Sequence, residues 1–376
     1  MVENTVRSHL YLQNTTQNLL SEPSMSNPSI ASLVASGTNL YLDSIDPALV
    51  KLNLEWGAVG ATSNPIIIAG LIETGRFDEP LAKLIASGSD DADIAWELTD
   101  QLVRDAQTAF LPTWNRTNGN AGWVSFELDP LIEDSQVNLP HAERVERYVE
   151  LGKKWSAGHQ NRMIKVPATP AGLDALSALC AAGITLNVTL VFTMEQYHSA
   201  RNNVWAGARK RANLEDFKSV YSIFVSRVDQ YSSKYLPSLS AAAQGQLGIV
   251  NAKQIWIDNQ QFWSKHPTRL QQEIIFASTG TKDPKDPKEK YVAALAGSDI
   301  QTNPPETNAA IAAGNFVFDR QVDKLPATAV VEELNSAANM QHLHDTLMAE
   351  GIAKFAAPQK QLIATIGRKR QALVGT

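Results

Sequence analysis

Short apolar runs alternate with longer amphipathic stretches about eight times along this chain of 376 residues. A short apolar run rich in β-branched residues predicts a buried strand, whereas apolar residues spaced three and four apart predict a helix. Strands that alternate with helices pair in parallel, because a parallel pair needs a long crossover connection. The strands that we expect span residues 39–42, 59–62, 123–128, 163–166, 184–190, 220–225, 274–277 and 299–302.

Closure of these strands into a (β/α)8 barrel is favoured over an open, doubly wound sheet. A dinucleotide-binding open sheet carries a glycine-rich turn after its first strand, and this chain has none. We therefore expect an α/β fold in which residues 37–376 form a single (β/α)8 barrel domain with additional helices, including those near the C-terminus. Residues 1–36 are rich in Ser, Asn and Thr, and we expect a polar N-terminal extension with no clear contribution to the core.

Two helices have specific signals in the sequence. The stretch 141–155 places its apolar residues on one face, which predicts an amphipathic helix. Thr169 followed by Pro170 predicts the N-cap and the first position of the helix after the fourth strand.

The composition and charge of the chain limit the binding partners and the cellular compartment that we expect. A net charge of −6 without a long basic block argues against nucleic acid and anionic membranes as partners. The single cysteine, Cys180, excludes an internal disulfide and suits a reducing compartment. No basic segment followed by an apolar one marks a secretory signal near the N-terminus. These features predict a cytoplasmic protein.

Polar side chains recur where the expected strands end. In a (β/α)8 barrel the chemistry lies at the carboxyl ends of the strands, so these side chains would meet at one mouth. The sequence therefore predicts an active site built from Asp43, Asn64, Glu127, Lys165, Asn187, Thr189, Ser222, Arg227, Ser278 and Lys282.

Lys165 is unusual because it lies inside the apolar run Met-Ile-Lys-Val-Pro. Burial disfavours the charged form of a lysine, and a partly neutral lysine is a nucleophile that forms Schiff bases with carbonyl substrates. The structural interpretation is that the stem packs in the strand while the ammonium reaches solvent or pairs with an acid. This segment taken alone favours the structural interpretation.

The other polar residues also have structural interpretations. Asp43 is a possible helix cap, Asn64 a turn residue, and Glu127 a neutralising partner for the lysine. Arg227 and Asp229 are a possible surface pair. Packing does not explain why polar residues recur at the same position of successive strands.

Other chemistries lack their motifs. His342 and His344 would point to different faces of a helix and have no evident third ligand, so a metal site is not expected there. The glycine spacing at 70–75 is not followed by the Lys-Ser/Thr of a phosphate loop.

The sequence around the strand ends resembles the transaldolase family, in its longer bacterial form, from about residue 39 onward. The matching stretches occur in the family's order, which makes the resemblance specific. They are LYLDSID, GATSNP, WVSFELDP, RMIKVPATPAGLDAL, GITLNVTLVF, SIFVSRVD, IIFASTGTKDP, TNPPET and EGIAKF.

The resemblance implies transfer of a dihydroxyacetone unit from a ketose phosphate to an aldose phosphate in the pentose phosphate pathway, without a cofactor or metal. The donor would be sedoheptulose 7-phosphate or fructose 6-phosphate. By this resemblance Lys165 forms the Schiff base, and Asp43 is the general base at the C4 hydroxyl of the donor. Glu127 would move protons through a water.

The resemblance also implies how the substrate is bound. Four residues would hydrogen-bond the three-carbon unit and its water: Asn64, Asn187, Thr189 and Ser222. Arg227 matches the family's phosphate-binding arginine, and Ser278 and Lys282 would complete that site. Phe224 is also expected to contact the substrate. A second phosphate-site arginine, found in shorter relatives, has no match in STGTK.

Two alternatives to transfer are open at this point. The first is a related fructose 6-phosphate aldolase that releases free dihydroxyacetone. Such aldolases carry Gln where Glu127 stands and Tyr where Phe224 stands, so both positions favour transfer. The second is a sugar-phosphate binding protein without catalysis, which the presence of Lys165 and Asp43 disfavours. A monomer and a homodimer are both compatible with the sequence.

Overall fold

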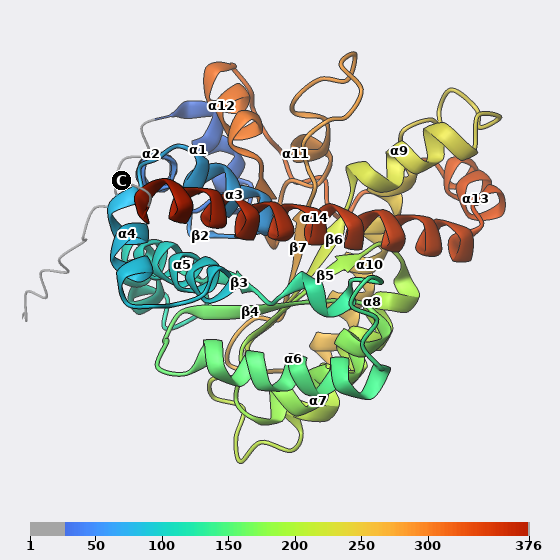
Figure 1. Cartoon of the computed structure of the whole chain (residues 1–376). Helices are drawn as coiled ribbons and strands as arrows, with labels where there is room; N and C mark the ends of the chain where they lie inside the picture. Colours follow the sequence, from blue (N-terminus) through green and yellow to red (C-terminus); the bar gives the residue numbers. More distant parts are fainter. Residues whose placement is uncertain (1–26, 375–376) are drawn as a thin grey trace, which may run out of the picture.

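The computed structural model describes residues 27–374, and its centre is a closed barrel of eight parallel strands (Figure 1). Each strand pairs with the next along the chain, and the last pairs with the first. The predicted (β/α)8 barrel is confirmed. The strands are β1 (Asn39–Leu42), β2 (Gly60–Ala61), β3 (Val124–Glu127), β4 (Arg162–Pro167), β5 (Leu186–Val191), β6 (Ser219–Phe224), β7 (Glu273–Ala277) and β8 (Ile300–Asn303).

Helices surround the barrel and fill the connections between its strands. In the part of the chain that the structure describes they are α1 (Pro28–Ala35), α2 (Pro47–Glu55), α3 (Pro65–Glu73), α4 (Asp78–Ala86), α5 (Asp91–Arg116), the 3₁₀ helix η1 (Pro130–Glu133), α6 (His141–Ser156), α7 (Pro170–Ala181), α8 (Met194–Ala208), α9 (Ser226–Tyr235), α10 (Leu247–Ser264), α11 (Lys290–Ala294), α12 (Pro305–Ala313), α13 (Thr328–Ala337) and α14 (Met340–Val374). No helix in residues 27–374 has both the length and the apolar character needed to cross a membrane.

Local sequence explains where several helices begin. The hydroxyl of Thr169 accepts a hydrogen bond from the amide of Gly172 at 3.0 Å, and Pro170 takes the first helical position, as predicted for α7. α6 covers the predicted stretch 141–155. Its apolar face packs toward the barrel, which is the usual source of stability for a surface helix.

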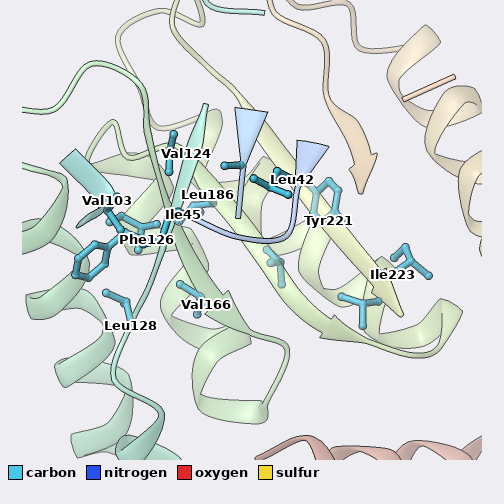
Figure 2. Close-up of a cluster of buried hydrophobic side chains, with 14 of the residues drawn as sticks. Leu42, Ile45, Val103, Val124, Phe126, Leu128, Val166, Leu186, Tyr221 and Ile223 are labelled. Atoms are coloured by element: carbon cyan, nitrogen blue, oxygen red, sulfur yellow. The ribbon is translucent and has the colours of Figure 1, made fainter. Parts of the chain in front are cut away.

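Side chains alternate between the barrel interior and the helix-covered outside along each strand. On β3, Phe126 faces outward and stacks on Trp155 of α6, with ring centroids 5.0 Å apart. Its neighbours Ser125 and Glu127 therefore face the interior. Figure 2 shows part of the outward-facing apolar cluster, which includes Leu42, Val124, Val166, Leu186 and Ile223.

The strand register places predicted site residues side by side. Glu127 of β3 pairs with Lys165 of β4, and Lys165 pairs in turn with Asn187 of β5. Parallel pairing of consecutive strands therefore brings a carboxylate, an amine and an amide into one row near the mouth of the barrel.

α1 differs from the prediction for the N-terminal region. Ile30 and Leu33 are completely buried in the core, and the Ser29 hydroxyl donates to the Gly314 carbonyl at 2.9 Å. The expectation that residues 1–36 contribute nothing clear to the core is wrong for residues 28–35, because a short amphipathic helix is hidden in a polar composition. Residues 1–26 lie outside the described part of the chain.

The long helix α14 runs across the face of the barrel where the strands end (Figure 1). It packs against α9 near its beginning and against α3, α4, α5 and η1 further along. Helices near the C-terminus agree with the prediction, whereas the course of α14 across the mouth of the barrel was not predicted.

Candidate active site

The carboxyl ends of the strands enclose a cavity of about 160 Å³. Most of the predicted site residues line it, together with side chains that were not among the predicted site residues. The predicted residues in its wall are Asp43, Asn64, Lys165, Thr189, Ser222, Phe224, Arg227, Ser278 and Lys282. The others are Thr62, Ile66, Ala277, Thr302, Pro304 and Phe355.

The amine of Lys165 is buried and held between three groups. Its Nζ donates to Oε2 of Glu127 at 3.0 Å and to the Ser63 carbonyl at 3.2 Å. The ring of Phe355 lies over the amine, with its centroid 5.5 Å from Nζ. Lys165 is 6% exposed, so this amine does not reach bulk solvent. Of the structural interpretation, the part in which the ammonium reaches solvent is wrong, whereas the part in which it pairs with an acid agrees with the contact to Glu127.

Lys165 interacts electrostatically with two buried carboxyl groups, those of Glu127 and Asp43. Burial raises the pKa of Glu127 above its ordinary value, and the nearby Lys165 opposes that rise. Burial also raises the pKa of Asp43, and both Lys165 and a hydrogen bond from the Thr62 hydroxyl at 2.8 Å oppose it. The site therefore places one amine beside two acids whose protonation is sensitive to their contacts.

Structural roles were also considered for Asp43, as a helix cap, and for Asn64, as a turn residue. The N-cap of α2 is Asp46, so Asp43 is not a helix cap. Asn64 does cap α3, because its side-chain oxygen accepts from the amide of Ile67 at 3.1 Å. Its side chain also lines the cavity, so the capping bond fixes the direction of an amide that faces the substrate space.

A chain of hydrogen bonds orients the amide of Asn187. Its oxygen accepts from the Ser222 hydroxyl at 2.7 Å, and its nitrogen donates to the Ser125 hydroxyl at 2.9 Å. Asn187 is thus held behind the cavity wall rather than in it. Thr189 has a buried hydroxyl with no hydrogen-bond partner among residues 27–374, and that hydroxyl is free to meet a ligand.

The other end of the cavity is cationic. Arg227, in the first turn of α9, lies over the ring of Phe224 at 5.2 Å, and its buried Nη1 has no hydrogen-bond partner within the described residues. Lys282 lines the same end. Ser278 adopts a φ of 56°, a strained conformation for a residue other than glycine, and its hydroxyl lies 2.9 Å from that of Ser226. An unpaired guanidinium beside hydroxyls is suited to bind a phosphate.

Arg227 and Asp229 do not form the surface pair that was considered. Asp229 is buried and accepts from the amide of Gly248 at 2.6 Å, and its other oxygen lies 3.9 Å from Lys290. Burial raises the pKa of Asp229 to about 6.

Comparison with known proteins shows to which family the chain belongs. Residues 40–366 match the family described as Transaldolase/Fructose-6-phosphate aldolase. The chain belongs to this family. It is similar to proteins named Transaldolase from Mycobacterium tuberculosis (strain ATCC 25618 / H37Rv), at 31% identity over 369 residues, and from Arthrobacter sp. (strain FB24), at 30% over 360 residues. These alignments cover 90% and 88% of this chain and 96% and 94% of the relatives.

The match to the transaldolase and fructose-6-phosphate aldolase family confirms the resemblance seen in the sequence. It extends from β1 into α14, so the helix across the mouth belongs to the matched region. It begins after α1, although α1 contributes to the core.

Thr62 and Phe355 line the cavity but were not predicted as site residues. Thr62 directly follows β2, so the strand-end rule could have found it. Phe355 comes from α14 and approaches Lys165 only through the packing of that helix, for which the sequence carries no local signal. In residues 27–374 no three His, Cys, Asp or Glu side chains come together in a way that could hold a metal. His342 instead lies 2.6 Å from the Tyr231 hydroxyl.

Proposed function

We propose that this protein is a transaldolase that transfers a dihydroxyacetone unit between sugar phosphates through a Schiff base on Lys165. The observation that carries the proposal is the setting of the Lys165 amine. It is buried in the barrel mouth, is hydrogen-bonded to Glu127, and shares a cavity with Asp43 and Arg227. Nη1 of Arg227 has no hydrogen-bond partner within residues 27–374. A nucleophile, two acids and a phosphate-binding group are the parts that this chemistry needs.

The first half of the reaction forms and uses the imine. Lys165 Nζ adds to the C2 carbonyl carbon of the ketose phosphate, and loss of water with Glu127 handling the proton gives the iminium. Asp43 then removes the proton from the C4 hydroxyl, and the C3–C4 bond breaks. Its electron pair passes through C3 and C2 to the iminium nitrogen, which leaves an enamine, and an aldose phosphate departs.

The second half reverses these steps on another aldehyde. C3 of the enamine attacks the carbonyl carbon of the acceptor aldose phosphate, and the acceptor oxygen takes the proton held by Asp43. Water then adds to the new iminium, and collapse of the carbinolamine releases the product ketose and restores the Lys165 amine. Arg227, Ser278 and Lys282 would hold the phosphate at the cationic end of the cavity.

Hydrogen-bonding side chains around the cavity would fix the three-carbon unit. Asn64 and Thr189 face this space, and Ser222 links it to the oriented amide of Asn187. Such positioning contributes to rate because the reacting atoms are held near their attack geometry.

The test is a donor-and-acceptor experiment. The protein is incubated with fructose 6-phosphate alone and with erythrose 4-phosphate added, while sedoheptulose 7-phosphate and free dihydroxyacetone are measured. We expect rapid formation of the seven-carbon product only when the acceptor is present. Rapid release of dihydroxyacetone without acceptor would instead identify a fructose 6-phosphate aldolase, which Glu127 and Phe224 disfavour. Binding of fructose 6-phosphate without either product would identify a non-catalytic binding protein.

A further inference from the structure

Phe355 is the one aromatic residue that the long C-terminal helix places in the wall of the cavity as the structure describes it. Its ring centroid lies 5.5 Å from Nζ of Lys165, and the side chain is 6% exposed. The polar contacts of the amine are to Glu127 and to the Ser63 carbonyl. Phe355 thus contributes an apolar surface at the place where the imine would form.

α14 is held across the mouth by contacts on both sides of Phe355. On one side, His342 lies 2.6 Å from the Tyr231 hydroxyl of α9. On the other side, Lys360 donates to Gln136 at 2.7 Å and Gln361 donates to Glu73 of α3 at 3.0 Å. These contacts on either side of Phe355 hold α14 over the cavity.

One turn before Phe355, the helix approaches β5 closely. A Cβ on Gly351 would lie 3.1 Å from Leu190 Cδ2, so the glycine lets the helix pack directly on the barrel. Leu190 itself has a φ of 56°. This close packing sets the height of Phe355 above Lys165.

The three-carbon intermediate has two fates that separate at C3 of the enamine. Release begins when C3 takes a proton, and transfer begins when C3 attacks the acceptor aldehyde. Both fates end when water adds to the resulting iminium and the carbinolamine collapses to restore the Lys165 amine. An apolar ring beside the nitrogen hinders the approach of a proton-donating water to the enamine, and this disfavours release.

We propose that Phe355 is a specificity-determining residue that suppresses protonation of the lysine-bound three-carbon enamine by water and so favours transfer over release. The inference rests on the proposed function and assigns to α14 a part in the choice between the two activities after which the family is described.

The experiment compares the wild type with Phe355→Ala, Phe355→Leu and Leu347→Ala. Release is the rate at which free dihydroxyacetone forms from saturating fructose 6-phosphate alone, and transfer is the rate of sedoheptulose 7-phosphate formation with erythrose 4-phosphate. We expect Phe355→Ala to raise the ratio of release to transfer by about tenfold, which corresponds to about 1.4 kcal/mol between the two barriers. Phe355→Leu, which keeps an apolar side chain, should raise it less.

Leu347→Ala is the matched control because Leu347 is buried on the same helix two turns earlier and does not line the cavity. It loosens the packing of α14 while Phe355 stays in place, so the ratio should stay near the wild-type value. An equal rise in Leu347→Ala, or an unchanged ratio in Phe355→Ala with both rates reduced together, overturns the proposal. If Phe355→Ala does not fold, Phe355→Leu decides, and a ratio at or below that of the wild type contradicts the inference.

The wild-type measurement separates this inference from the proposed function. If the wild type forms no sedoheptulose 7-phosphate, the proposed function fails. If it transfers normally and the variants leave the ratio unchanged, only the role of Phe355 fails.

Discussion

Nζ of Lys165 and Oε2 of Glu127 lie 3.0 Å apart, and their side chains are only 7% and 6% exposed. Two opposite charges can be buried in a barrel interior because each compensates the other. Removing one of them leaves the other buried without a counter-charge. Burial raises the pKa of Glu127, while Lys165 holds it down. The nucleophile and its proton-handling acid therefore form one electrostatic unit.

Lys165→Met is expected to fold, to lose all transfer activity, and to become sensitive to pH. Without the ammonium, the pKa of Glu127 in the folded state rises further above its value in the unfolded chain. The folded protein then binds a proton that the unfolded chain does not, so stability falls as pH rises through that window. We expect Lys165→Met to lose about 3 kcal/mol of unfolding free energy near neutral pH and less near pH 5.

The control for this prediction is the double variant Lys165→Met/Glu127→Gln, which removes both charges of the pair and leaves Asp43 as the other buried acid of the site. Urea denaturation at several pH values should show that the double variant recovers most of the loss. A double variant as pH-sensitive as the single one would show that Glu127 is not the group responsible.

Thr62→Val is expected to move the acid limb of kcat/KM to higher pH. The Thr62 hydroxyl donates to the Asp43 carboxylate at 2.8 Å and opposes the rise that burial causes in the Asp43 pKa. Loss of the donor raises that pKa further, so Asp43 becomes an ionised base only at higher pH. A shift of about one unit is expected for a hydrogen bond to a charged group.

Thr302→Val is the matched control for Thr62→Val. The Thr302 hydroxyl lies 2.9 Å from that of Thr62 and is therefore one hydrogen bond further from Asp43 than Thr62 is. The pH profile of kcat/KM should therefore shift less in Thr302→Val. An acid limb that stays in place or moves down in Thr62→Val would exclude Asp43 as the titrating base.

Arg227→Met is expected to weaken the use of phosphorylated donors specifically. Nη1 of its buried guanidinium has no hydrogen-bond partner in the described part of the chain, and a phosphate would meet that donor. Loss of a charge-assisted contact worth about 1.5–3 kcal/mol should lower kcat/KM for fructose 6-phosphate roughly 10- to 100-fold. The rate with unphosphorylated fructose should change little, and an equal loss with both sugars would place Arg227 outside the phosphate site.

Asp229→Asn is expected to stabilise the protein more at pH 8 than at pH 4. The folded-state pKa of Asp229 is about 6, above the ordinary value of 3.8. Between these values the folded protein binds a proton that the unfolded chain lacks, so this group makes stability fall as pH rises from about 4 to about 6. Asparagine keeps the acceptor for the Gly248 amide and removes the charge.

The measurement for Asp229→Asn is the difference in unfolding free energy from the wild type at the two pH values. That difference should be up to about 3 kcal/mol more favourable to the variant at pH 8. A difference that does not depend on pH would show that Asp229 titrates in the same range in the folded and unfolded states.

The fold was predictable because strands and helices carry different hydrophobic periods. The stretch at 299–302 became β8 (Ile300–Asn303), and the apolar run around Lys165 became β4. The helix α1 was missed although Asn27 followed by Pro28 is a helix-start signal, because a polar composition obscured the two apolar residues that it buries.

The site was predictable only where the barrel topology itself brings residues together. Consecutive parallel strands place Glu127 beside Lys165 without further information. Phe355 depends on the course of α14 across the mouth. The periodicity of a helix shows which face is apolar, but it does not show which side of a barrel that face will cover.

The most direct test of this account is borohydride trapping with fructose 6-phosphate, followed by mapping of the labelled peptide. Reduction should fix the three-carbon unit to Lys165, abolish tryptic cleavage at that residue, and inactivate the protein in proportion to labelling. Lys165→Met should take up no label under the same conditions. A label on any other lysine of the wild type, or none at all, would contradict the assignment of Lys165 as the Schiff-base nucleophile.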